Sequence, residues 1–221
     1  MRAPFSPVWL FFFVGLVLWI TLSINLKLIT LSFEKLGLGP ESALTLMVTS
    51  LFGSAINLPL FSMKASMPPN IEAILPPGLL RPPQPRFTGR TQVAVNVGGC
   101  LVPLFFSGYL LRNYDLPAIP LLITIAIVAA ISYRLSRPIP GIGIAMPILV
   151  APLTAAVLAI AIGGEFRAPL AYVGGSLGVL IGADILRLKD VQHLGAPVAA
   201  IGGAGTFDGI FMTGLVAVLL T

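Results

Sequence analysis

Long apolar runs, separated by short segments that hold nearly all of the charges, dominate the chain. The first run is long enough to cross a hydrocarbon layer of about 30 Å as a helix, and it has no cleavage site after it. The pattern predicts about seven transmembrane spans, near Val8–Leu26, Glu41–Phe61, Thr91–Leu111, Pro117–Leu135, Ile142–Gly163, Ala168–Leu186 and Ala196–Leu220. The expected fold class is therefore all-α, a polytopic helical bundle in which residues 1–221 form a single transmembrane domain.

The segment over residues 137–163 is interrupted by residues that break helices, because proline lacks the backbone N–H and glycine weakens a helix. These residues are Pro138, Pro140, Gly141, Gly143, Pro147 and Pro152. The segment either spans the membrane or forms a re-entrant or broken element. A re-entrant segment would move the C-terminus to the cytoplasmic side.

The only long loop covers residues 63–90 and is rich in proline. Its apolar residues indicate that it lies at the membrane interface. Two alternatives remain open for this loop: a stiff connector between the second and third spans, or a lid or partner-docking segment.

Composition agrees with a membrane protein, since 57% of the 221 residues are hydrophobic, 10% are charged and the mean hydropathy is +0.99. Such a chain cannot cover a soluble core with a hydrated surface, which excludes a soluble enzyme. One cysteine, Cys100, and one histidine, His193, are too few for a zinc or iron–sulfur centre. We expect no metal, no cofactor and, despite the net charge of +5, no nucleic acid partner.

The lysines and arginines fall unequally on the two sides of a seven-span arrangement. One side has Arg2, Lys64, Arg81, Arg86, Arg90, Arg134, Arg137, Arg187 and Lys189, and the other has Lys27, Lys35, Arg112 and Arg167. Basic residues in short loops stay in the cytoplasm. The sequence therefore predicts a multi-pass protein of the cell inner membrane, with its N-terminus and its long loop in the cytoplasm.

Two segments of the chain resemble each other weakly. Residues 92–100, followed by Phe105–Gly108, are similar to residues 197–204, followed by Phe211–Gly214. If the second and third spans are duplicated as the sixth and seventh, polar residues correspond between the copies. These residues are Asn57 and Asn96 in one copy and Asp184 and Asp208 in the other.

Asp184 and Asp208 are the two carboxylates that fall within predicted spans. A charged side chain in hydrocarbon is costly, so each needs a proton, a partner or a wet cavity. Asp184 has the alternative of an ion pair with Arg187. Asp208 has the alternative of capping a half-helix. The glycines around it, Gly202, Gly203, Gly205 and Gly209, indicate unwound backbone or close helix packing, and thus a hinge.

Asn57 and Asn96 are amides in the second and third predicted spans. They either hydrogen-bond between helices or complete a polar cluster with the two aspartates. Two carboxyl groups in one low-dielectric site titrate apart, as an aspartyl peptidase requires. The same pair serves a proton-coupled transporter. We therefore expect a protonatable aspartate pair in a transport or accessory role, with an intramembrane aspartyl peptidase as the alternative.

The strings IGADILRL, GAPVAAIGGAGTFDGIFMTG, PRFTGRTQVAVNVGG and SRPIPGIGIAMP resemble the prokaryotic membrane family named Domain of Unknown Function 1614. This resemblance implies a multi-pass membrane protein and no established activity. Asp184 and Asp208 also give a weaker likeness to the presenilin and signal-peptide-peptidase group. The chain departs from the GxGD motif of that group at Thr206 and Phe207. Expected partners are the lipid bilayer and either another membrane protein or a second copy of the chain.

Overall fold

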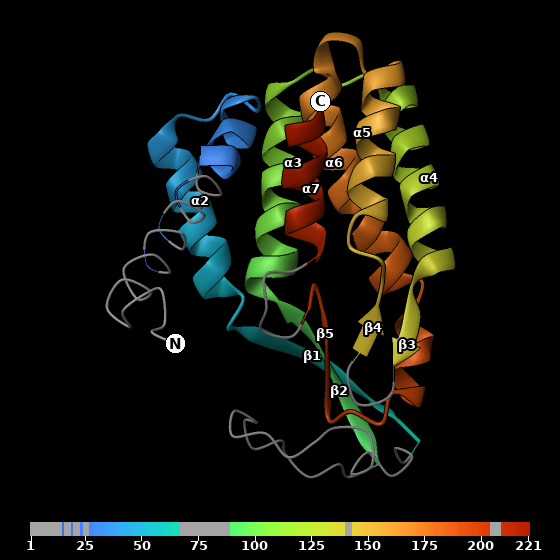
Figure 1. Cartoon of the computed structure of the whole chain (residues 1–221). Coiled ribbons are helices and arrows are strands. Elements are labelled where there is room, and N and C mark those ends of the chain that lie inside the picture. The colour runs from blue at the N-terminus through green and yellow to red at the C-terminus, as the bar shows by residue number, and fades with distance from the viewer. Residues whose placement is uncertain are drawn as a thin grey trace, which may run out of the picture.

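The computed structural model describes residues 15, 19, 23, 27–66, 89–139, 143–203 and 209–221. Most of these residues are helical (Figure 1). After a helix over residues 27–34, the elements are α2 (Pro40–Gly53), β1 (Asn57–Lys64), β2 (Arg90–Asn96), the π-helical turn η2 (Val97–Leu101), α3 (Val102–Asn113), α4 (Ala118–Leu135), β3 (Arg137–Ile139), β4 (Gly143–Ala145), α5 (Val150–Ile162), η3 (Gly164–Phe166), α6 (Arg167–Val179), the π-helical turn η4 (Leu180–Ile185), the 3-10 helix η5 (Leu188–His193), β5 (Val198–Ile201) and α7 (Gly209–Leu220).

Helices α3 to α7 stand side by side, and the strands lie together at one end of this bundle (Figure 1). Two helical stretches, Ala118–Leu135 and Gly164–Ile185, are long and apolar enough to cross a membrane. The second is central, because 78% of its apolar window is buried, against 22% of the first. This difference in burial reflects the position of α6, which packs against α3, α4, α5 and α7.

Glycines let α6 pack closely against its neighbours. A Cβ atom added at Gly174 would lie 2.4 Å from Cγ2 of Thr124, and one at Gly178 would lie 2.6 Å from Cβ of Val128. Gly182 follows four residues later and meets the backbone of Ala129. This spacing of glycines every four residues is the small-residue pattern that brings helices together in membranes.

In the described part of the chain, the strands form two small sheets. The first has the order β1-β2-β5, with β1 antiparallel and β5 parallel to β2, and the second pairs β3 with β4. Pro59 has no N–H to donate, which suits the edge position of β1 and the register shift between Pro59 and Phe61. The parallel partner β5 comes after a long crossover through α3 to α6.

The expectation of an all-helical fold is correct for most of the described chain but misses these sheets. Apolar stretches near residues 57–61, 91–96, 143–145 and 198–201 are strands rather than parts of spans. A short apolar strand and a buried helix segment have the same hydropathy, so a hydropathy pattern does not separate them. Seven spans and a duplication of whole spans are not confirmed.

The two similar segments become neighbours in the sheet. Residues 92–95 of β2 pair in parallel with residues 198–201 of β5. Each strand precedes a pair of glycines, Gly98–Gly99 in one case and Gly202–Gly203 in the other. The resemblance thus coincides with two adjacent strands, while Asn57 and Asp184 belong to different kinds of element, a strand and a π-helical turn.

Several sequence predictions fall on residues that the structure does not describe. The first predicted span is outside the described residues, except for Gly15, Trp19 and Ser23, which are helical. Of the long loop, Met63 and Lys64 end β1, and the part over residues 67–88 lies outside. The segment 137–163 forms the β3–β4 pair and then α5, which runs back along α4 and α6 (Figure 1).

Candidate functional site

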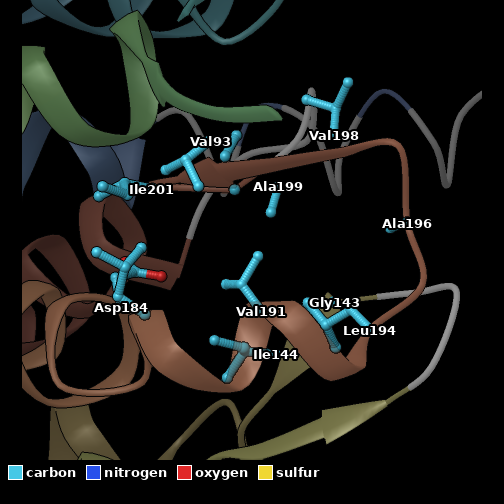
Figure 2. A pocket seen from close by; sticks show the side chains of 13 residues that line it. Val93, Gly143, Ile144, Asp184, Val191, Leu194, Ala196, Val198, Ala199 and Ile201 are labelled. Carbon is cyan, nitrogen blue, oxygen red and sulfur yellow. The ribbon is translucent and has the colours of Figure 1, made fainter. Parts of the chain in front are cut away.

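A pocket with a volume of about 270 Å³ lies where the helical bundle meets the sheets. Its lining comprises Val93, Gly143, Ile144, Asp184, Leu188, Val191, Leu194, Ala196, Val198, Ala199, Ala200, Ile201 and Gly203. Figure 2 shows Asp184 at one end, with a carboxylate oxygen directed into the space, β5 along one side, and Val191 and Ile144 opposite. Among these lining residues, Asp184 is the one with a charged side chain.

The helix around Asp184 is wound as a π-helix. Its backbone lies in η4, and the N–H of Leu186 donates to the carbonyl of Ile181 at 2.9 Å, closing a five-residue turn. Such turns are rare and frequently occur at functional sites. The side chain of Asp184 is half-buried, between the helical interior and the pocket.

Gly202 fixes the backbone beside the Asp184 carboxylate. Its N–H donates to Oδ2 of Asp184 over a long 3.4 Å. Gly202 has a φ of +83°, and a Cβ atom there would lie 2.6 Å from Cβ of Cys100. Since L residues other than glycine rarely adopt this conformation, and since no space remains for a side chain, the position requires glycine.

Arg187 holds the chain that follows Asp184. Its guanidinium forms a salt bridge with Asp190 at 2.8 Å and donates from Nε to the carbonyl of Tyr133 at 3.2 Å and to Oγ of Ser136 at 3.3 Å. It also lies 4.3 Å from the centroid of the Tyr133 ring. The i,i+3 salt bridge of Arg187 is therefore with Asp190, and it ties η5 to the end of α4.

The two asparagines form a separate hydrogen-bonded group. Nδ2 of Asn96 donates to Oδ1 of Asn57 at 3.0 Å and to the carbonyl of Ser54 at 2.7 Å, and its Oδ1 accepts from the N–H of Gly99 at 2.7 Å. Asn96 is fully buried. These contacts join the end of α2, the strands β1 and β2, and η2, so Asn96 orders the backbone on which Gly202 packs.

Two of the predicted hinge glycines, Gly202 and Gly203, lie beside the pocket. Gly202 and Gly203 both have a φ of +83°, and Gly203 lines the pocket. Gly209 is the first residue of α7. Gly205 and Asp208 are outside the described residues, and their proximity to Asp184 remains a prediction.

Sequence reasoning missed the strand residues that line the pocket. They are Val93 of β2, all four residues of β5, and Gly143 and Ile144 of β4. The available signal was the glycine and proline before β5 and before β4, Gly195 and Pro197 in one case and Pro140 and Gly141 in the other. Within the described part of the chain, no group of three or more His, Cys, Asp or Glu side chains could hold a metal ion.

Over the described residues, the fold and the site define a class of mostly helical protein with two candidate membrane-spanning helices and a pocket that contains an aspartate beside a small sheet. The family model described as "Protein of unknown function (DUF1614)" matches residues 51–220, which is more than half of the chain. The chain belongs to this family. Comparisons with curated proteins and with solved structures find no match.

Proposed function

We propose that the protein is a multi-pass protein of the inner membrane and that the Asp184 pocket is its functional site. In this proposal the pocket has a binding role, accessory to another membrane component, and Asp184 exchanges a proton, paired with Asp208. The observation that carries the proposal is the direction of the Asp184 carboxylate into a pocket whose other lining residues are uncharged (Figure 2). A pocket with mostly apolar walls and a charged group directed into it has the usual character of a binding site.

The apolar exterior of the bundle supports membrane insertion. Ile119 and Leu122 of α4 and Val157 and Ile160 of α5 are exposed over more than half of their surface. Large apolar side chains on the outside of a helical bundle are favourable in contact with lipid tails and unfavourable in water. We infer that lipid covers these helices.

An accessory binding role fits the packing better than transport through the bundle does. Large side chains fill the interior of the described bundle, including fully buried Tyr172, Phe211 and Leu170. The pocket lies at the end of the bundle, beside the sheets. A transporter needs a site near the bilayer midplane at the meeting of broken helices.

Carbodiimide labelling tests the protonatable site, because these reagents modify protonated carboxyl groups in apolar surroundings. We expect dicyclohexylcarbodiimide to label Asp184 in membranes, located by peptide mass spectrometry. The modification at this position should be absent in Asp184→Asn and unchanged in the control variant Asp115→Asn, which alters an exposed carboxylate between α3 and α4. Wild-type protein with no label on Asp184 between pH 5 and 8 contradicts the proposal.

Proteoliposomes separate binding from transport. The accessory role predicts that the reconstituted protein carries no proton current, as read with a pH-sensitive dye inside the vesicles. A current that disappears in Asp184→Asn contradicts this role and supports transport.

A second candidate is an intramembrane aspartyl peptidase that uses Asp184 and Asp208. It is favoured by the chain path, since Gly203 lines the pocket and the segment from Gly203 to the start of α7 at Gly209 contains Asp208. One ionised carboxylate would activate water as a base while the protonated partner donates to the leaving nitrogen.

The peptidase predicts that Asp184→Asn and Asp208→Asn each abolish cleavage of membrane peptides while thermal unfolding of the purified protein stays unchanged. The control Asp115→Asn, in the chain between α3 and α4, should keep full activity. Cleavage that persists in either of the two single variants excludes this candidate.

A further inference from the structure

A groove with a volume of about 590 Å³ lies between α2 and α3. The two helices run in opposite directions (Figure 1). They come close at the end nearer to the sheets, where a Cβ atom added at Gly53 would lie 3.0 Å from the backbone nitrogen of Gly98. The groove follows α2 from Thr49 to Glu41, which lies in the first turn of this helix. Glu41 is therefore at the end of the bundle away from the sheets.

The α2 wall of the groove is polar. Its residues are three or four positions apart, so they share one face of the helix. They are Glu41, Ser42, Thr45 and Thr49. Leu44, on another face of the same turn, is exposed over 56% of its surface and suits contact with lipid tails. Oγ1 of Thr45 already donates to the carbonyl of Glu41 at 2.8 Å, so this hydroxyl is left to accept a hydrogen bond. The polar wall therefore favours a ligand that donates.

The α3 wall of the groove is aromatic. Phe106 and Tyr109 stack with their ring centroids 5.9 Å apart, and Phe105 beside them is exposed over 73% of its surface. The faces of aromatic rings attract cations, and the carboxylate of Glu41 in the opposite wall adds a negative charge. The groove is therefore complementary to a compact cation that carries an apolar chain.

We propose that this groove binds one phospholipid with an ethanolamine headgroup. The inference goes beyond the role of the Asp184 pocket, and it rests only on the membrane insertion proposed above. An ethanolamine ammonium has three N–H donors for the oxygens of the α2 wall, whereas the trimethylammonium of choline has none. An anionic headgroup brings no cation to offset Glu41.

The dimensions of the groove suit this ligand. Eight helical steps separate Glu41 from Thr49, which is about 12 Å along the axis of α2. The ammonium lies between Glu41 and Tyr109, and the acyl chain follows Phe105 toward the sheet end. Arg112, one helical turn after Tyr109, provides a positive charge near the same end of α3 for the lipid phosphate.

The test uses the full-length protein in detergent and dioleoyl lipids with ethanolamine, choline or glycerol headgroups. Native mass spectrometry measures the Kd of the first bound lipid. We expect the ethanolamine lipid to bind about fivefold more tightly than the other two, the ratio that about 1 kcal/mol of added attraction gives. Glu41→Gln should remove this preference. The control Glu165→Gln, an exposed carboxylate of η3, should keep it.

A second pair of variants tests the location. Thr45→Trp places a large ring in the groove and should abolish the preference, whereas Leu44→Trp on the outer face of the same turn should keep it. Both positions are exposed, so both variants should unfold at the wild-type temperature.

Three results overturn the inference. They are equal affinity for the three headgroups, a preference that survives in Glu41→Gln or in Thr45→Trp, and a dimer of the chain that excludes the lipid and is lost only in Thr45→Trp. The last result would show that a second copy occupies the groove. None of them changes the carbodiimide labelling of Asp184, which tests the proposed function separately.

Discussion

At the scale of single residues, the site depends on how glycine and asparagine hold the backbone beside Asp184. Asn96 donates to Asn57 and to Ser54, and it accepts from Gly99 in η2. Gly202 packs on the backbone of η2 and donates to Asp184. The position of the Asp184 carboxylate therefore depends, through η2 and Gly202, on the fully buried side chain of Asn96.

Replacing Gly202 by alanine tests this dependence. Gly89 is the matched control, since it has a similar φ of +78° but open space around its Cβ position, whereas Gly202 would meet Cys100 at 2.6 Å. The left-handed conformation alone costs an L residue roughly 1–2 kcal/mol. We expect Gly89→Ala to lose about that much stability, and Gly202→Ala to lose clearly more, as measured by denaturant unfolding in detergent.

Gly202→Ala should also slow the carbodiimide labelling of Asp184, because the amide that donates to the carboxylate must move. Equal stability losses in the two alanine variants would contradict the close packing at Gly202.

The sequence identified some of these residues but not their contacts. Asp184, Asn57, Asn96 and Gly202 stand out because polar or flexible residues are costly in apolar runs. The sequence offered Asp184 as an ion-pair partner of Arg187, whereas the printed salt bridge of Arg187 is with Asp190, also three residues away. The π-helical turn that contains Asp184 was likewise not predicted from the sequence.

At the scale of elements, α6 owes its central position to its glycines. Gly174, Gly178 and Gly182 face α4, while Gly175 faces Ala155 of α5 and Thr213 of α7. Lipid tails are as apolar as the helices, so close van der Waals contact between small residues drives their association.

Gly178→Ala should therefore disrupt the packing of α4 on α6, because the new methyl group would lie 2.6 Å from Val128. The expected loss in unfolding free energy is about 1–3 kcal/mol, as for other overpacked cores. Gly108→Ala is the control on α3, where nothing lies within 4 Å, and it should be neutral or slightly stabilising. A neutral Gly178→Ala contradicts the close approach of these helices.

Arg187 connects two elements, α4 and η5, through its planar guanidinium. Lysine keeps the charge but not the forked geometry or the stacking on Tyr133. We expect Arg187→Lys to lower the thermal unfolding temperature, while Lys189→Arg on the exposed side of η5 should not. An unchanged temperature for Arg187→Lys would show that charge alone holds the connection.

Helices were more predictable from the sequence than strands. The cores of α3 to α7 coincide with predicted apolar runs, because helices of this bundle are apolar on most sides. The strands lie within the same apolar runs, so hydropathy does not distinguish them from helices. The signals that indicate strands are local ones, such as Pro59 and the Pro140–Gly143 segment. Two strands pair through residues that are far apart in the chain, and a local sequence pattern does not predict such contacts.

At the scale of the whole molecule, the basic residues are distributed unequally between the two ends of the bundle. Lys64, Arg90, Arg134, Arg137, Arg187 and Lys189 belong to the sheets or to helix ends beside them, while Arg112 and Arg167 belong to the opposite ends of α3 and α6. We infer from the positive-inside rule that the sheet end is cytoplasmic.

Cysteine labelling in intact cells measures this orientation. On a Cys100→Ala background, Arg112→Cys should react with a membrane-impermeant maleimide from outside, and Lys189→Cys should react only after the cells are opened. The reverse pattern contradicts the proposed orientation and moves the Asp184 pocket to the outer surface.

The pairing of β2 with β5 has a consequence for biosynthesis. Oγ1 of Thr91 donates to the carbonyl of Ala196 at 2.6 Å, across 105 positions of sequence. Since contacts this distant form late, a growing chain holds one wall of the acidic pocket long before the ribosome supplies the opposite wall. Polypeptides that end before β5 therefore lack one wall of this pocket.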